Sequence, residues 1–533
     1  MRRWNGWGQD TTDYPLPESA AEYLTSLIGS GSTTPDATQD QVLRNVPTSR
    51  LAAAPPLSLE PTDRLRHACG HSLPDWVAIR SGTLRTFPDA VIYAGSEDDV
   101  RSAFALCRQT GAALIPYGGG TSVVGHINPL PDGPPTVTLD LSRLHQLRAL
   151  DETNHVAVFE AGVNGPDLEA QLAARGYTLG HFPQSFEFST LGGWVATRSC
   201  GQQSFYYGRI EDLFCGGHVE APTGAIDLPD LPASAAGPDL RQLLLGSEGR
   251  MGVITQAHVR VRRIPESESF YGVFFHDWAS GAAAVREMAQ GGLLVSMMRL
   301  SDAQETETTL ALAGKPDLTR WADRGLRLAG YQAERSLLIL GITGESLRAR
   351  QTLRHAAHVC RKHGALFPIG MIGHMWQKSR FLTPYLRDTL WLRGYALDTV
   401  ETALPWAGAL DAAHKIQQTL RDAFAAQNLQ LLVFTHLSHI YADGASVYTT
   451  YIFPRAEGPE ATVAAWRAAK TAVSQMIVSL GGTISHQHGV GLDHAPYLEA
   501  EKGAAGIAAL RAAFRTFDPD GMLNPGKLIA PQM

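Results

Sequence analysis

The alternation of apolar and polar residues between positions 90 and 265 predicts strands and short helices in turn. Residues 90–93 form a continuous apolar run, and apolar residues then recur at helical spacing from Val100 to Cys107, after an N-cap signal at Ser96. Residues 112–115 form a second apolar run that leads directly into three glycines. This strand–helix–strand unit places the glycines where α/β folds usually bind ligands. Further strands are predicted for residues 136–141, 155–161 and 257–263, and a further helix after Asn164.

The hydrophobic pattern changes at about Glu266, where longer strands and helices begin. Strands are predicted for residues 271–275, 336–342, 431–435 and 446–453, and helices for residues 346–364, 408–427 and 460–480. The last two strands are close enough in sequence to pair as antiparallel neighbours. We therefore expect an antiparallel sheet with helices on one face in this half of the chain.

Composition indicates a globular protein with more than one hydrophobic core. The chain has 533 residues, of which 44% are hydrophobic and 18% charged, and this length exceeds what one core supports. The net charge of −7 argues against a nucleic-acid-binding protein. The sequence contains no run of 18 apolar residues, so we expect no transmembrane helix. No apolar segment follows Met1, so we expect no secretory signal. The five scattered cysteines favour reduced thiols in a cytoplasmic protein.

The loop from Pro116 to Gly125 is the first candidate for ligand binding. Three consecutive glycines leave their backbone N–H groups bare, and the hydroxyls of Thr121 and Ser122 can add two donors. We therefore predict a pyrophosphate cradle. The next segment, residues 127–135, contains four prolines and cannot be a helix, which excludes a Rossmann turn. No Gly-Lys-Ser/Thr follows the glycines, which excludes a Walker loop.

Two further glycine-rich segments follow in the same half of the chain. Gly192 and Gly193 lie in a Ser/Thr-capped segment, where they suit close approach to a flat ligand or, equally, tight packing of a helix on a sheet. Residues 246–252 form a third glycine-rich turn that leads into a strand. Three such segments favour an elongated ligand, a dinucleotide rather than a single phosphate.

The turn from Thr483 to Gly491 contains the best catalytic candidates. His486 and His488 lie at i and i+2, on one face of an extended segment, where one could be a general base and the other its orienter. Metal binding is the alternative, with further ligands from the pair His436 and His439 or from the pair Asp493 and His494. We favour catalysis, because no acidic residue lies at helical spacing from the two histidines.

Two arginines and the C-terminal turn segment are further candidates. A buried arginine needs an anion, so Arg299 or Arg387 could meet a substrate phosphate or carboxylate. Arg387 could instead pair with the adjacent Asp388. Residues 518–527 consist almost entirely of turn residues, and Asn524 and Lys527 could return to the ligand.

Taken together, these segments resemble the flavoproteins of the vanillyl-alcohol oxidase type and, among them, the alkylglycerone-phosphate synthase family. No single segment is specific, but the set runs nearly from one end of the chain to the other. The matching segments are Trp4–Gly8, Gly118–Ser122, Phe186–Trp194, Tyr207–Gly208 with Ile210–Leu213, Gly246–Thr255, Arg299–Leu300, Pro384–Asp388, Glu401–Trp406 and Ser485–Gly491.

The resemblance implies an α+β fold, with a two-lobed FAD-binding domain and an antiparallel-sheet cap domain over the substrate. On this basis we assign residues 1–80 to an N-terminal arm anchored on the surface, 81–265 to the FAD-binding domain, 266–500 to the cap domain and 501–533 to a tail returning to the FAD-binding domain. FAD would be non-covalent, because Thr121 stands where covalent members have a histidine. The residues expected to bind FAD are Pro116, Gly118, Gly119, Gly120, Thr121, Ser122, Pro183, Ser185, Thr190, Gly192, Gly193, Thr197, Glu248, Gly252, Val253, Ile254, Asn524 and Lys527.

The resemblance also implies a reaction, the exchange of an acyl chain for a long-chain alcohol on dihydroxyacetone phosphate through an adduct at flavin N5. Tyr448, His486 and His488 would be acid–base groups, Arg387 would bind the phosphate or lie at the adduct, and Arg299 would support the site. We expect no metal ion and a homodimer. The long-chain substrate favours peripheral contact with a membrane, although no amphipathic anchor is found.

The chain departs from the family pattern at two places. Gln487 replaces the middle histidine of the family's Ser-His-His-His run, and residues 492–494 replace the basic residue that follows. The alternative is therefore an FAD-dependent 2-hydroxy acid oxidase or dehydrogenase of the same fold, in which His488 abstracts a proton and Arg387 holds the carboxylate. A flavin-free binding or scaffold protein is a third class, which a yellow preparation would exclude.

Overall fold

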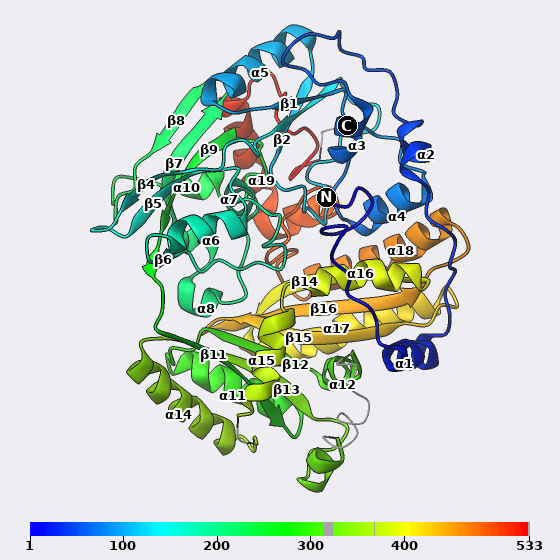
Figure 1. Cartoon of the computed structure of the whole chain (residues 1–533), viewed down its shortest axis with the longest axis vertical. Helices are drawn as coiled ribbons and strands as arrows, with labels where there is room; N and C mark the ends of the chain where they lie inside the picture. The colour runs from blue at the N-terminus through cyan, green and yellow to red at the C-terminus, as the bar shows by residue number, and fades with distance from the viewer. Residues whose placement is uncertain (313–322, 367, 531–533) are drawn as a thin grey trace.

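The chain forms three main sheets, with an N-terminal arm that runs between them (Figure 1). The structure is a computed structural model and describes residues 1–312, 323–366 and 368–530. A three-stranded and a five-stranded sheet lie in the upper part of Figure 1, and a six-stranded sheet lies in the lower part. The predicted α+β class is confirmed.

The three-stranded sheet is parallel and contains the predicted strand–helix–strand unit. Its order is β1 (Ala90–Tyr93), β3 (Thr136–Asp140) and β2 (Ala113–Tyr117), with α5 (Glu97–Thr110) connecting β1 to β2. The Ser96 side chain caps α5 by accepting from the Asp99 N–H, as the sequence predicted. The Asp99 carboxylate, however, accepts from Gly95, so the reciprocal capping box does not form.

The five-stranded sheet is antiparallel and carries the other two glycine-rich segments at its ends. Its order is β4 (Leu147–Asp151), β5 (Val156–Glu160), β9 (Val253–Arg260), β7 (Phe214–Ala221) and β8 (Gly224–Leu228). The helices α6 (Gly165–Ala173) and α7 (Leu191–Thr197) connect β5 to β7, together with α8 (Ser204–Tyr207), α9 (Ile210–Leu213) and β6 (Tyr177–Thr178), which pairs with β10 (Arg262–Arg263). The short α10 (Arg241–Leu244) lies between β8 and β9.

The C-terminal segment packs on both of these sheets. The helix α19 (Leu498–Phe517), preceded by a 3-10 turn at Ala495–Tyr497, buries Leu498, Ile507 and Phe514 in the hydrophobic cluster of the five-stranded sheet. Beyond it, Leu523 forms a parallel bridge with Leu114 of β2. The chain end therefore fastens the three-stranded sheet to the five-stranded one.

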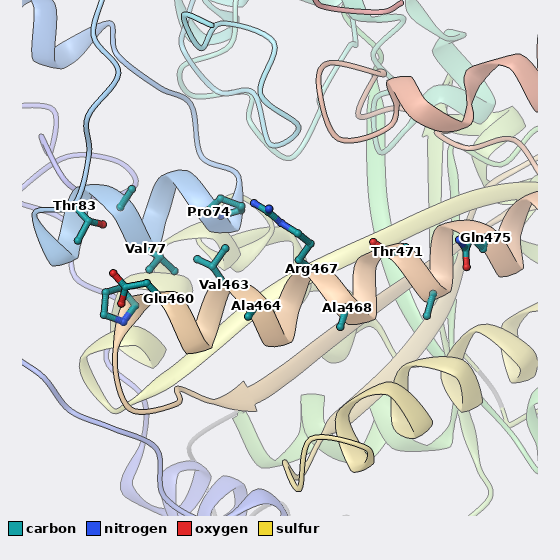
Figure 2. A pocket seen from close by; sticks show the side chains of 13 residues that line it. Pro74, Val77, Thr83, Glu460, Val463, Ala464, Arg467, Ala468, Thr471 and Gln475 are labelled. Atoms are coloured by element: carbon teal, nitrogen blue, oxygen red, sulfur yellow. The ribbon is translucent and has the colours of Figure 1, made fainter. Parts of the chain in front are cut away.

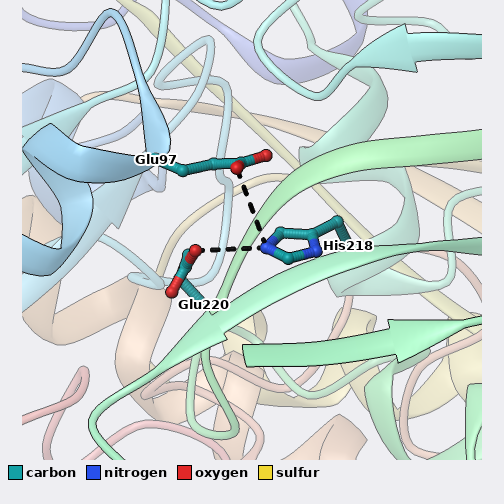
Figure 3. A group of neighbouring side chains, drawn as sticks. All are labelled: Glu97, His218 and Glu220. Atoms are coloured by element: carbon teal, nitrogen blue, oxygen red, sulfur yellow. Dashed lines mark hydrogen bonds and ion pairs between the residues drawn. The ribbon is translucent and has the colours of Figure 1, made fainter. Parts of the chain in front are cut away.

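A polar cluster forms a second link between the same two sheets (Figure 3). His218 on β7 lies between Glu220 of the same strand and Glu97 at the start of α5, with N···O separations of 3.1 and 4.0 Å. Their ligand atoms are close enough to hold a metal ion. Arg101 already pairs with Glu220, however, and the Nδ1 of His218 lies 2.6 Å from Asp227. A protonated His218 therefore satisfies these carboxylates as an ion-pair network.

The six-stranded sheet is antiparallel, as predicted, with the order β11 (Ser267–Phe275), β13 (Ser336–Gly344), β12 (Met297–Ser301), β15 (Leu432–Ile440), β16 (Gly444–Pro454) and β14 (Tyr395–Pro405). One face packs into a large hydrophobic cluster with α11 (Trp278–Gln290), α14 (Ser346–Lys362), α17 (Trp406–Ala425) and α18 (Pro459–Ser479). The expectation of helices on one face alone is wrong. On the opposite face α15 (Gly370–Ser379) packs on β11. The helix α16 (Thr383–Leu392) contacts the edge strand β14, and α12 (Ala303–Leu312) contacts the inner strands β12, β13 and β15.

The N-terminal arm contacts the rest of the chain along most of its length. Its first helix, α1 (Glu18–Ile28), packs with α16 and strands of the six-stranded sheet. After α2 (Gln39–Leu43) and α3 (Pro61–Arg66), α4 (Leu73–Ser81) lies along α18, where Val77 and Val463 line a shallow groove (Figure 2). No helix in the described part of the chain is long and apolar enough to cross a membrane. All five cysteines are free, as predicted.

Candidate active site

A cavity of about 1180 Å³ lies between the open face of the six-stranded sheet and the glycine-rich loops. It brings together most of the residues that the sequence singled out. Those that line it are Tyr448, His488, Arg387, Arg299, Pro116, Gly118, Gly119, Gly120, Thr121, Ser122, Pro183, Ser185, Thr190, Gly192, Gly193, Thr197, Glu248, Gly252, Ile254 and Asn524. Three candidates, His486, Val253 and Lys527, are not part of this lining.

The glycine loop has the geometry of an anion cradle. Residues 118–123 line the cavity, and in the described part of the chain their backbone N–H groups donate to no other group. Bare N–H groups in succession bind anions such as a pyrophosphate. A Cβ at Gly119 would overlap the carbonyl oxygen of Phe188, and Gly120 has a φ of +66°. The residues present therefore fit the pyrophosphate of FAD, and glycine is required at these two positions.

The other two glycine-rich segments hold the walls of the cavity in place. Gly192 donates its N–H to the Ala161 carbonyl at 2.7 Å, and a Cβ there would crowd Ala161, so this glycine allows α7 to pack on the sheet. The Glu248 carboxylate accepts from the N–H groups of Val490 and Gly491 at 2.6 and 2.9 Å. The third glycine turn is thereby tied to the histidine turn.

The C-terminal turn reaches the cavity through one residue of the predicted pair. The Asn524 amide donates to the carbonyl of Glu248 at 2.8 Å and to that of His126 at 3.1 Å. Lys527 is fully buried and donates to the Asn128 carbonyl at 2.6 Å. Burial lowers the pKa of Lys527 to about 7. Lys527 therefore holds the backbone next to the glycine loop and does not reach the cavity.

Strand register places four polar side chains in one row across the six-stranded sheet. Ser301 pairs with His436, His436 with Tyr448, and Tyr448 with Glu401. The rings of His436 and Tyr448 stack with centroids 4.9 Å apart. Burial raises the pKa of Tyr448, so this phenol stays protonated. The row faces the cavity opposite the glycine loop.

Arg299 extends this row and is paired, unlike the isolated arginine that the sequence suggested. Its Nη2 lies 2.6 Å from Glu305 Oε1 on α12, and the same oxygen lies 3.0 Å from His436 Nδ1. Burial alone would raise the pKa of Glu305, but Arg299 and His436 hold it at about 2. Glu305 therefore carries the charge that keeps Arg299 in place.

His488 lies beside Tyr448 and is held by Glu401. The two rings meet edge to face with centroids 5.7 Å apart. Glu401 Oε1 accepts from the N–H groups of Gln487 and His488 at 2.8 and 2.7 Å, and lies 3.5 Å from His488 Nδ1. Burial lowers the pKa of His488, while Glu401 acts against this. A neutral imidazole with a carboxylate behind it has the arrangement of a general base and its orienter.

His486 points away from the cavity, although it was predicted to act there with His488. It is buried, and its Nε2 lies 2.8 Å from Arg209 Nη1 and 2.6 Å from the Tyr441 hydroxyl. Its ring stacks on that of His439, with centroids 5.1 Å apart. His439, and not His486, is part of the cavity wall.

Arg387 is a cation of the wall for which the described part of the chain provides no carboxylate partner. Its Nη1 donates to the His71 carbonyl at 2.6 Å, and its guanidinium lies over the Trp76 ring at 4.4 Å. In the described part of the chain, its Nε and Nη2 have no hydrogen-bond partner. The alternative of a salt bridge to Asp388 does not form, because Asp388 pairs with Arg80. The charge of Arg387 remains for an anionic ligand.

The N-terminal arm contributes to the same wall, contrary to the expectation that it only anchors itself. Trp7 lines the cavity and contacts the rings of His71 and Phe188, with centroids 5.3 and 5.5 Å away. Its backbone N–H donates to Asp388 at 3.2 Å. The two aromatic residues in a glycine-rich segment indicated that this part of the arm makes close contacts. The sequence alone does not show which surface the segment covers.

One end of the cavity is apolar. It lies between α12, α15 and the first strands of the six-stranded sheet, where the wall is built from aliphatic side chains, methionines, one phenylalanine and one tryptophan. Its residues are Phe274, Leu312, Leu326, Leu337, Ile339, Leu366, Ile369, Met371, Ile372, Met375 and Trp376. This end can take a long hydrocarbon chain while a charged group stays near Arg387.

Glu401 and Glu305 are the functional residues that sequence reasoning missed. Each is a buried carboxylate that holds a candidate catalytic side chain. Glu401 was part of a family-like segment, but its strand also contains Asp398, so residue type alone did not single it out. Among the described residues, only Glu97, His218 and Glu220 bring three ligand atoms close enough to hold a metal ion, and the histidine turn does not.

Comparisons with known proteins agree with this geometry. Residues 88–227 match the family described as FAD binding domain, and residues 264–528 match FAD linked oxidases, C-terminal domain. Alkyldihydroxyacetonephosphate synthase of Dictyostelium discoideum is 31% identical over 476 residues, which cover 87% of this chain and 77% of that protein.

More distant relatives include an oxidoreductase. Mitochondrial D-lactate dehydrogenase [cytochrome] of Arabidopsis thaliana is 27% identical, over 84% of this chain and 74% of that protein. Among solved structures, an alkyldihydroxyacetonephosphate synthase superposes with a TM-score of 0.84 at 26% identity and covers 98% of both chains.

Proposed function

This chain is an FAD-dependent enzyme of the alkyldihydroxyacetonephosphate synthase family, and we propose that it exchanges the acyl chain of an acyl-dihydroxyacetone phosphate for a long-chain alcohol, a step of ether lipid synthesis. The observation that carries this proposal is the shape of the cavity. It joins the glycine-loop cradle and an arginine without a carboxylate partner to a long apolar end, which a small 2-hydroxy acid does not need. A lipid that carries a phosphate needs both ends of this cavity.

We assign the substrate phosphate to Arg387. A buried guanidinium without a carboxylate partner attracts an anion strongly, because little water screens it. Arg299 is already neutralised by Glu305, so its role is to hold His436 behind Tyr448. The apolar end takes the hydrocarbon chain of the acyl group and then that of the alcohol.

His488 is the proposed proton acceptor. In the exchange, the alcohol loses its hydroxyl proton as its oxygen bonds to the dihydroxyacetone carbon, and the acyl group leaves as a carboxylate. His488 is neutral, lies beside Tyr448 and has Glu401 to stabilise its protonated form. When bound, FAD supplies an electron-poor ring system beside these groups. The reaction brings no net oxidation or reduction.

The flavin is proposed to be non-covalent. Thr121 follows the third glycine and lines the cavity, and its hydroxyl cannot form the tether that a histidine forms in covalent members. Precipitation of the holoenzyme with acid should release all the flavin into the supernatant. Flavin that stays with the pellet would contradict this.

The exchange is tested by incubating the holoenzyme with acyl-dihydroxyacetone phosphate and labelled hexadecanol. We expect label in an alkyl product and an equal amount of free fatty acid. The alternative, a 2-hydroxy acid oxidase or dehydrogenase, predicts anaerobic bleaching of the flavin by such acids. Rapid bleaching without label transfer would refute the synthase. Action in the cytoplasm, for which the five free cysteines are the support, is a further proposal, as are a homodimer and peripheral membrane contact.

A further inference from the structure

Arg209 is a largely buried arginine that contacts both the ring and the backbone of a single residue, His486. Its Nη1 lies 2.8 Å from His486 Nε2, and its Nη2 donates to the His486 carbonyl at 3.2 Å. Its Nε pairs with Glu211 at 2.9 Å. The side chain therefore holds both the ring of His486 and the backbone that leads to His488.

These contacts determine where His486 carries its proton. A guanidinium has donors and no acceptor, so His486 Nε2 must accept, and the ring hydrogen must be at Nδ1. The Tyr441 hydroxyl lies 2.7 Å from the same Arg209 nitrogen and 2.6 Å from His486 Nε2. It therefore accepts from Arg209 and donates to the ring, which favours the same tautomer.

The surroundings of His486 also disfavour a charged ring. Burial, and then the neighbouring His439, Arg209 and His488, lower the pKa of His486 well below its usual value. The carboxylate of Glu211 is already paired with Arg209. In the described part of the chain, His486 Nδ1 has no hydrogen-bond partner.

We propose that Arg209 is a positioning residue that fixes His486 as the neutral Nδ1–H tautomer and thereby anchors the turn that presents His488 to the substrate. His486 then packs behind His439 as a structural residue and does not act as an acid or base. The two histidines of the turn have different tasks because their partners have opposite charges. A cation locks His486, and an anion, Glu401, activates His488.

The tautomer is tested by nitrogen NMR on holoenzyme labelled with ¹⁵N-histidine, with His486→Asn used to assign the signals. We expect His486 to show a protonated Nδ1 and a bare Nε2 that do not change between about pH 6 and about pH 8. Arg209→Gln should give a mixture of tautomers, and Arg209→Lys, which keeps a donor, should restore the single form. The kcat of Arg209→Gln should fall about 10-fold to 100-fold with KM nearly unchanged, because His488 is displaced.

Tyr441→Phe is the matched variant. It removes the hydroxyl but leaves Arg209, so the Nδ1–H form should persist. An unchanged tautomer in Arg209→Gln, or its loss in Tyr441→Phe, would overturn the inference. If Arg209→Gln does not retain FAD, the Tyr441→Phe spectrum decides alone. Only the expected fall in kcat rests on the proposed function. The NMR spectrum needs no substrate, so the tautomer result would stand even if the exchange assay failed.

Discussion

At the scale of single residues, buried carboxylates decide what the candidate catalytic groups can do. Glu401 is fully buried and faces His488 and the N–H groups of its turn. Burial makes the imidazole a weaker base, and the negative charge partly restores its basicity. The strength of His488 as a base is therefore a balance between these two effects.

Glu401→Gln tests this balance, because the amide oxygen still accepts from the turn while the charge is lost. We expect kcat to fall about 100-fold and the acidic limb of the pH–rate profile to move to lower pH, since the group that raises the pKa of His488 is gone. Stopped activity assays across pH measure both. Glu305→Gln, which faces Arg299 instead, should not move that limb.

Gly119→Ala tests the cradle. The new Cβ would overlap the Phe188 carbonyl oxygen, and overpacking of about 1–3 kcal/mol should weaken FAD binding about 5-fold to 100-fold. Flavin content and titration of the apoprotein with FAD measure the loss. Gly95→Ala is the control, because its Cβ meets nothing closer than 3.8 Å, and FAD binding there should stay as in the unaltered protein.

The sequence predicted which residues belong to the site better than it predicted their partners. The histidine turn, the glycine loop and Arg387 could be found from residue type and spacing, because local chemistry marks them. The lack of a carboxylate partner for Arg387 could not be predicted, because Asp388 is adjacent in sequence but pairs with Arg80, more than 300 positions away. For the same reason, nothing in the spacing of His486 and His488 shows that only one reaches the cavity.

At the scale of elements, local signals predicted where helices and strands lie along the chain. They did not predict which face of a sheet each helix covers. The caps of α5 and the apolar stripe of α17 depend on neighbours within a few positions, so both were predicted close to their observed bounds. The position of α15 on the open side of the six-stranded sheet depends on contacts with β11 about 100 positions earlier. This helix closes the apolar end of the cavity.

Met375 on α15 offers a test of that end. It lines the cavity and is 40% exposed, so a lysine there can reach water without unfolding the helix. Met375→Lys should raise KM for a long-chain alcohol about tenfold, roughly 1.4 kcal/mol, and affect short alcohols less. Leu347→Lys, an exposed position on α14 away from the cavity, is the control and should change neither value. Equal effects on all chain lengths would contradict the assignment.

At the scale of the whole molecule, the two upper sheets are joined by a cluster that responds to pH. Burial alone would lower the pKa of His218, but hydrogen bonds to Asp227 and Glu220 raise it above the usual value (Figure 3). The folded protein thus binds this proton more tightly than the unfolded chain does. The resulting stability is fully present below the unfolded pKa and is lost as pH rises through the folded pKa.

His218→Gln should remove this pH dependence. We expect the free energy of unfolding of the unaltered protein to fall from about pH 6 to about pH 9 through this group, and the variant to lack that component. Urea unfolding followed by tryptophan fluorescence measures it. His355→Gln, an exposed histidine on α14, should leave the dependence as it is. A variant with the unaltered profile would refute the role of His218.

The cavity is lined by residues from nearly the whole length of the chain, from Trp7 to Asn524, and this affects when FAD can bind during synthesis of the protein. A chain still growing on the ribosome lacks Asn524 and the histidine turn until synthesis is nearly over. Such a chain can fold its parallel sheet but cannot enclose a flavin, because one side of the enclosure has not yet been translated. Cofactor capture is therefore a late event, and proteolytic clipping at either end opens the same enclosure again.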